Sequence, residues 1–203
     1  MNGYFYVKRI IIIQKHTKRK DKRGIGMRRY VSISLAFACL LLVGSFVAYA
    51  GEGRGTPYSG SRGYEHMKQL VGVWEGTSNM GKEGQKIKVE YHLTAGGSAI
   101  VETLFPGTTE EMISVYYDDN KGRLSMTHYC MLQNRPSMKL ERGSPDALAF
   151  VYAKGGGIDP KKDAHMHALT ISFVDKDHIV EEWTYFENGK EKGVTKLNLS
   201  RVH

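Results

Sequence analysis

The chain has 203 residues, of which 41% are hydrophobic and 25% are charged, and its formal net charge at pH 7 is +8. Residues 1–30 hold ten Lys and Arg against one acid, a net charge of +9, so the rest of the chain carries −1. This nearly neutral body argues against nucleic acid or another polyanion as a partner, because the basic charge is confined to a leader.

An uncharged, apolar run occupies residues 31–50, after Met27-Arg28-Arg29, and it ends in Ala48-Tyr49-Ala50. A positive start, an apolar centre and small residues before a cleavage point are typical of a secretory signal peptide. We therefore expect residues 27–50 to be a signal cleaved near Ala50-Gly51. The mature protein would then be periplasmic or secreted, without a stable membrane span. The alternative is an uncleaved anchor, since about 20 apolar residues can just cross a bilayer.

The segments on either side of this signal have different interpretations. Residues 1–26 fit no part of a signal peptide, and Met27 stands where one would start, so we interpret 1–26 as an over-extended gene start. Residues 51–63 are rich in Gly, Ser and Pro and are expected to form a flexible tether. Residues 64–203 form the expected single domain. With the signal removed it contains one cysteine, Cys130, and therefore no internal disulfide.

The domain begins with Tyr64–Leu70, where Met67 and Leu70 share a face and predict one or two helical turns. After this segment the hydrophobic period becomes two, and turn residues such as Asn188-Gly189 separate short β-rich runs. The expected strands are Val71–Asn79, Gln85–Leu93, Ser98–Phe105, Glu111–Tyr117, Arg123–Leu132, Met138–Glu141, Ala147–Ala153, His165–Val174, His178–Phe186 and Val194–Arg201. The fold class is all-β, an up-and-down antiparallel meander of about ten strands. Such a meander avoids exposed edges most easily by closing into a barrel.

Gly72-Val73-Trp74 opens the first expected strand just after the short helix, and Arg201 closes the last one. Over Tyr64–Val202 this arrangement resembles the calycin superfamily (lipocalins, fatty-acid-binding proteins and nitrobindin-like haem proteins), in particular its uncharacterised bacterial exported branch. The resemblance implies a calycin-like barrel in which Trp74 packs at the floor beneath Arg201. Both residues are then structural, since a cation stacked on an indole contributes about 1–2 kcal/mol.

Strand alternation predicts which side chains face the interior. In the run Arg123–Leu132 the mostly apolar face carries His128 and Cys130. In the run that begins at His165, both His165 and His167 alternate with apolar residues, whereas Met166 is expected to point outward. The side chains expected inside from these two strands are Leu124, Met126, His128, Cys130, Leu132, His165, His167, Leu169, Ile171 and Phe173. Four potential metal ligands are thus expected in one interior.

The chemistry of these four residues leaves several interpretations open. Neutral imidazole and thiolate suit zinc, and His-x-His places two imidazoles about 6.5–7 Å apart on one face. The resemblance to nitrobindin-like proteins implies haem iron bound by a histidine as another form. If two strands lie between the two histidine-bearing strands, these are about 14 Å apart around the wall, which disfavours one ion touching all four residues. The same side chains could instead line a pocket for an organic ligand, or be ordinary buried groups.

Glu102 and Tyr116 are further candidate ligand-binding residues. Glu102 shares a face with Ile100 and Leu104, but the opposite face of that strand is also apolar, so the pattern does not decide its burial. If Glu102 is inside, it needs a partner, since an unpaired buried carboxylate is costly. Tyr116 could add a phenol to the same cavity, although Tyr117 could equally be the inward residue.

The leading functional hypothesis is an exported β-barrel that binds a small apolar or amphipathic molecule in its lumen, anchored by these His and Cys side chains. The alternative is a metal- or haem-binding protein, possibly enzymatic, that uses the same residues. A third hypothesis is an envelope interaction protein that works through loops 133–137 and 155–163. No set of nucleophile, base and acid stands out, so we assign no catalytic residue.

Overall fold

The structure is a computed structural model that describes residues 57–81 and 84–203. The expected gene-start extension 1–26, the signal 27–50 and the first residues of the tether, 51–56, lie outside the described residues. The elements are α2 (Arg62–Met67), η2 (Lys68–Leu70), β1 (Gly72–Ser78), β2 (Gln85–Thr94), η3 (Ala95–Gly97), β3 (Ala99–Leu104), β4 (Met112–Asp118), β5 (Leu124–Tyr129), β6 (Ser137–Gly143), β7 (Ala147–Ala153), β8 (His165–Phe173), β9 (His178–Glu187) and β10 (Lys190–Arg201). None of the helices in these residues has the length and apolar character needed to cross a membrane.

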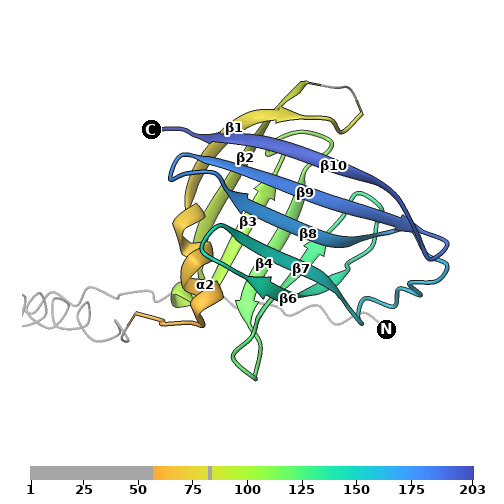
Figure 1. Ribbon diagram of the computed structural model, residues 1–203, viewed down its shortest axis with the longest axis horizontal. Coiled ribbons are helices and arrows are strands. Elements are labelled where there is room, and N and C mark those ends of the chain that lie inside the picture. Colours follow the sequence, from red (N-terminus) through yellow and green to blue (C-terminus); the bar gives the residue numbers. More distant parts are fainter. Residues whose placement is uncertain (1–56, 82–83) are drawn as a thin grey trace, which may run out of the picture. The chain divides into compact units, whose positions relative to one another are not determined.

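The ten strands form one closed antiparallel barrel (Figure 1). Each strand pairs with the next one in the chain, and β1 also pairs with β10, so the sheet has no free edge. The expected all-β meander with a short helix before it is confirmed. Closure explains the result physically, because it gives every strand of the meander a paired neighbour on both sides.

Two strand ends differ from the expectation for local reasons. β5 stops at Tyr129 instead of Leu132, because a turn begins at Cys130, whose backbone N–H donates to the Asn134 carbonyl at 3.1 Å. Gln133 in this turn has a φ of 59°, which no strand residue adopts. β10 begins at Lys190 instead of Val194, since the tight turn at Asn188 and Gly189 pairs Lys190 directly with Glu187.

The helix α2 lies at one end of the barrel (Figure 1) and is fixed there by polar contacts. The Ser61 hydroxyl caps the helix by accepting from the Tyr64 N–H at 3.2 Å. The Asp118 carboxylate, at the end of β4, accepts from the Ser61 backbone N–H and hydroxyl and from the Tyr58 hydroxyl. These contacts hold the described end of the expected tether. Tyr64 and Met67 are fully buried and close this end of the lumen.

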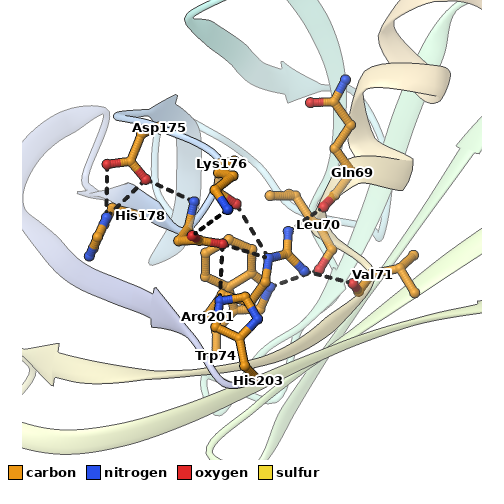
Figure 2. Close-up of polar contacts among 10 residues, drawn as sticks. Gln69, Leu70, Val71, Trp74, Asp175, Lys176, His178, Arg201 and His203 are labelled. Carbon is orange, nitrogen blue, oxygen red and sulfur yellow. Dashed lines mark hydrogen bonds and ion pairs between the residues drawn. The ribbon is translucent and has the colours of Figure 1, made fainter.

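Arg201 lies over the Trp74 indole at the same end, 4.2 Å from guanidinium carbon to ring centroid (Figure 2). The two residues are register partners on β10 and β1, and Trp74 is fully buried. The guanidinium also donates to the carbonyls of Gln69, Val71 and Lys176, while the indole N–H donates to the Leu70 carbonyl at 2.7 Å. This stack therefore ties the last strand to the segment between the helix and the first strand.

Candidate functional site

A row of polar side chains crosses the otherwise apolar interior. It is set by register, since Tyr91 of β2 pairs with Glu102 of β3, Glu102 with Ser114 of β4, and Ser114 with His128 of β5. Residues directly opposite each other in an antiparallel pair point to the same face. All four are buried, as is Glu181, which comes from β9 on the other side of the row.

Hydrogen bonds join the row to Glu181. The Tyr91 hydroxyl lies between the two carboxyls, 2.9 Å from Glu102 Oε1 and 2.5 Å from Glu181 Oε1. The Tyr116 hydroxyl donates to Glu102 Oε2 at 2.9 Å, and the Trp183 indole N–H donates to Glu181 Oε2 at 3.0 Å. Each oxygen of both carboxyls therefore has a partner, as buried polar atoms require.

At the other end of the row, the Ser114 hydroxyl and His128 Nδ1 are 3.0 Å apart. The His128 ring packs against Trp183, with ring centroids 4.5 Å apart. Hydrogen bonds thus connect Trp183, Glu181, Tyr91 and Glu102 at one end and Ser114 with His128 at the other. Glu102 and Ser114 join the two parts as neighbouring partners on β3 and β4. We call the whole set the lumenal polar chain.

Burial perturbs the acid–base chemistry of this chain. It raises the pKa of Glu181 well above its ordinary value, and the negative charge of Glu102 adds to the shift. Burial also raises the pKa of Glu102, although hydrogen bonds from Ser114, Tyr91 and Tyr116 stabilise its ionised form. For His128, burial lowers the pKa to about 4, so its imidazole is neutral at pH 7.

A small cavity of about 20 Å³ lies where this chain meets the end of the barrel opposite α2. His128 and Trp183 line it, together with apolar and weakly polar side chains, namely Met80, Leu104, Phe105, Met112, Met166, Thr195 and Leu197. The space suits about one water molecule. Most of the lumen is filled by side chains, so a larger molecule would need some of these residues to move.

The backbone is strained beside this cavity. Phe105 has a φ of 54°, in the left-handed region that bulky side chains rarely adopt, and its side chain is almost fully buried. Strained residues of this kind persist where the surrounding structure holds them, and they are concentrated at ligand sites. Here the Phe105 N–H donates to the Lys88 carbonyl at 3.0 Å, and the Phe105 carbonyl accepts from the Thr108 hydroxyl at 2.8 Å.

The other two histidines lie apart from the lumenal polar chain. On β8 the register shifts between Met166 and Ala168, so that His167 is an extra residue opposite β9. This bulge reverses the alternation. Met166, which the sequence pattern placed outside, lines the lumenal cavity with His128, and that expectation was wrong. His165 Nε2 is instead 3.0 Å from His167 Nδ1, and both rings contact Tyr152 and Phe186.

Cys130 sits in the turn after β5, half-buried against the core, and burial raises the pKa of its thiol. Leu132, expected inside, is 41% exposed because the strand has already ended. Within the described residues no three or more His, Cys, Asp or Glu side chains are grouped so that they could hold a metal ion. Of the four predicted metal ligands, the structure brings together His165 and His167.

The structure joins three of the predicted ligand-binding residues, Glu102, Tyr116 and His128, and adds others that the sequence analysis missed. Tyr91 and Ser114 belong to inward faces whose alternation was visible in the sequence. Glu181 alternates with Ile179 and Trp183, and this could have suggested its burial. The residues added to the site are Tyr91, Ser114, Glu181 and Trp183.

Larger hollows lie on the surface at the α2 end. Two of them, of about 350 and 290 Å³, share His66, Gln69 and Pro145. His66 is stacked on Phe173, with ring centroids 4.0 Å apart, and the Arg201 donors already serve backbone carbonyls. Two of the groups that line these hollows, His66 and Arg201, are therefore already engaged by other parts of the protein.

Comparison with known proteins adds little beyond the fold. No family model matches the chain, and no curated protein matches it. Among solved structures, one similar protein is a protein of unknown function from the DUF3598 family of Nostoc punctiforme. It is 12% identical, and the match covers 67% of this chain and 48% of that protein, with a TM-score of 0.41. The chain thus spans about half of that protein's length.

Proposed function

We propose that this barrel binds a small apolar or amphipathic molecule at the end of its lumen opposite α2, with His128 as the polar anchor. The observation that carries the proposal is the composition of the lumenal cavity. One imidazole, backed by buried hydroxyl and carboxyl groups, faces a lining that is otherwise mostly apolar. A mostly apolar pocket with few, fixed polar groups is the usual form of a small-molecule site.

The fixed position of His128 favours an anchoring role. Ser114 holds Nδ1, Trp183 packs against the ring, and the residue is 1% exposed. In residues 57–81 and 84–203 we find no hydrogen bond to Nε2, which therefore remains for a ligand. Because the imidazole is neutral at pH 7, it recognises a hydrogen bond and not a negative charge.

Room for the ligand would come from methionine. Met80, Met112 and Met166 line the cavity, and unbranched thioether side chains change rotamer more readily than branched or aromatic ones. Met80 and Met166 are only half-buried, so they can swing toward solvent without opening the core. A ligand that displaces one of them exchanges one set of apolar contacts for another.

Calorimetric titration of the purified full chain with 1-octanol and 1-decanol tests the proposal, with Trp183 fluorescence as a second readout. Met166→Ala enlarges the cavity, and we expect the decanol affinity to rise by about tenfold, since each buried CH₂ contributes about 0.8 kcal/mol. Met131→Ala is the matched control, because Met131 is 49% exposed in the turn after β5. The absence of binding to both proteins would refute the proposed function.

The proposal also covers family and location. The Trp74 and Arg201 stack, the helix before β1 and the closed meander support a place among calycin-like barrels. The signal-like composition of residues 27–50 supports export to the periplasm or beyond. N-terminal sequencing of the protein recovered from the periplasmic fraction tests export, and a product that retains residues 27–50 would contradict it.

A further inference from the structure

The number of hydrogens at Tyr91 determines the protonation of the buried acids. A phenol has one hydrogen, yet the Tyr91 oxygen lies within hydrogen-bond distance of Glu102 Oε1 and Glu181 Oε1. Two ionised carboxylates have no hydrogen to share with it. At least one of the two carboxyls must therefore be a neutral acid that donates to the Tyr91 oxygen, while Tyr91 donates to the other.

The remaining contacts show which carboxyl is which. Glu102 accepts from the hydroxyls of Tyr91 and Tyr116, and the Ser114 hydroxyl faces it from the paired position on β4. Surrounding hydroxyl groups of this kind stabilise a buried carboxylate. Glu181 has the indole N–H at one oxygen and the phenol at the other. Glu181 is accordingly the neutral acid and Glu102 the anion.

This assignment fixes the tautomer of His128. If the Ser114 hydroxyl donates to Glu102, its oxygen must accept from His128, so Nδ1 carries the hydrogen. Nε2 then presents a lone pair toward the cavity. The polar point of the cavity is thus an acceptor, connected to an anion through one hydroxyl group.

No cation offsets that anion inside the barrel. In the described part of the chain the buried polar and charged side chains are Ser78, Glu102, Ser114, Ser125, His128, His165 and Glu181, with no Lys or Arg among them. A lumen of this composition has a negative potential, and low dielectric walls strengthen it.

We infer that the molecule bound at the lumenal cavity carries a hydrogen-bond donor, best a protonated amine on an apolar body, and that carboxylates are rejected. The inference rests on the proposed function and specifies its ligand class. An ammonium N–H would donate to His128 Nε2, and its positive charge would offset the negative charge of Glu102. A carboxylate would meet a lone pair and a negative potential instead.

The test compares three probes of equal chain length, octylamine, 1-octanol and octanoate, titrated calorimetrically into the full chain at pH 7.5. Octylamine is expected to bind most tightly, 1-octanol next, and octanoate at least about tenfold more weakly than octylamine. Displacement of bound 1-octanol by octylamine shows that both occupy one site. Octanoate binding as tightly as octylamine would overturn the inference, while octanol binding would still support the proposed function. Failure of all three probes would overturn both.

Two variants locate the source of the preference. Glu102→Gln removes the lumenal anion, and the preference for octylamine over octanoate should fall to about threefold or less. Glu182→Gln is the matched control, because it removes the same charge from the next position on β9, where the side chain pairs with Lys196 outside. An unchanged preference in Glu102→Gln, or an equal loss in both variants, would overturn the inference. If circular dichroism shows Glu102→Gln unfolded, the wild-type order of the three probes decides alone.

Discussion

Raising the pH from 7 to 8.5 should destabilise the folded protein through Glu181. The folded barrel keeps a proton on this carboxyl, because burial and the charge of Glu102 raise its pKa well above the ordinary value of 4.5. In the unfolded chain the same group is ionised above about pH 5. The folded state thus binds one proton more, and the stability that this proton provides is present at low pH and is lost as pH rises through the folded pKa.

The size of this pH effect on the free energy of unfolding follows from the one extra proton that the folded state binds. While the pH stays between the unfolded and the folded pKa of Glu181, the free energy of unfolding falls by about 1.4 kcal/mol per pH unit. His128, with a folded pKa of about 4, is neutral in the folded protein throughout the window from pH 7 to 8.5, and the phenols of Tyr91 and Tyr116 stay protonated. Cys130 adds a smaller fall of the same sign near pH 8.5, because its thiol begins to ionise in the unfolded chain while burial raises its pKa in the folded one.

Urea unfolding followed by circular dichroism at several pH values measures this slope. Glu181→Gln should remove most of it with little loss of stability, since the amide N–H can donate to Tyr91 and the amide oxygen can accept from Trp183. Glu102→Gln should cost more, about 2–4 kcal/mol, because the amide NH₂ would face a phenol O–H that needs an acceptor.

Glu182→Gln, on the outer side of the same strand, is the control that should keep the wild-type slope. The assignment of protons would be refuted if Glu181→Gln kept the pH slope of the wild type. It would also be refuted if Glu102→Gln were the better tolerated of the two lumenal variants.

Three other predictions concern separate parts of the barrel. Arg201→Lys should destabilise the protein by about 1–3 kcal/mol in urea unfolding, because a lysine cannot stack on Trp74 and reach three carbonyls together. Gly76→Ala should cost about 3 kcal/mol or more, since its Cβ would lie 1.8 Å from the Asn198 carbonyl oxygen. His128→Gln should reduce the loss of stability between pH 6.5 and 4 by about 3 kcal/mol, because wild-type His128, with a folded pKa of about 4, must be neutral to fold.

Each of these predictions has a control. Gly193→Ala places a methyl group in open space on β10 and should be close to neutral in the same unfolding assay. Lys196→Ala, near the outer face of that strand, should change stability by less than about 1 kcal/mol, in contrast to Arg201→Lys. His178→Gln changes an exposed histidine that is paired with Asp175. This variant should change the loss of stability between pH 6.5 and 4 much less than His128→Gln does. Equal effects in a variant and its control would contradict the corresponding prediction.

Alternation along single strands predicted the fold and the inward position of His128, but not the rest of the site. It placed His128 beside Met126 and Leu124, and the structure buries all three. It could not decide Glu102, since both faces of β3 are apolar. The register settles this point, because Glu102 lies opposite Tyr91 and Ser114, whose side chains supply the partners that a buried carboxylate needs. The register between two strands cannot be deduced from the alternation pattern of either strand alone.

The same reasoning failed at β8 for a local reason. His-x-His predicts two imidazoles on one inward face only when the strand is regular, and the bulge at His167 breaks that condition. Bulges depend on how two strands fit across several residues, so the hydrophobic period does not reveal them. The turn at Cys130 is a second example, because it depends on Gln133 adopting a positive φ, which is uncommon for this residue.

The buried acids of the lumenal polar chain are not explained by a contribution to stability. Replacing buried polar and ionised groups by apolar residues of similar volume is often neutral or stabilising, so Glu102 and Glu181 contribute little net stability that leucine or methionine could not supply. Under the proton assignment proposed above, their effect is instead to fix the hydrogen positions from Glu181 to His128. A binding site gains from that order, because its acceptor is already aimed before the ligand arrives. Under the proposed function, the buried acids would act on the cavity by setting the polarity that the His128 imidazole presents to a ligand.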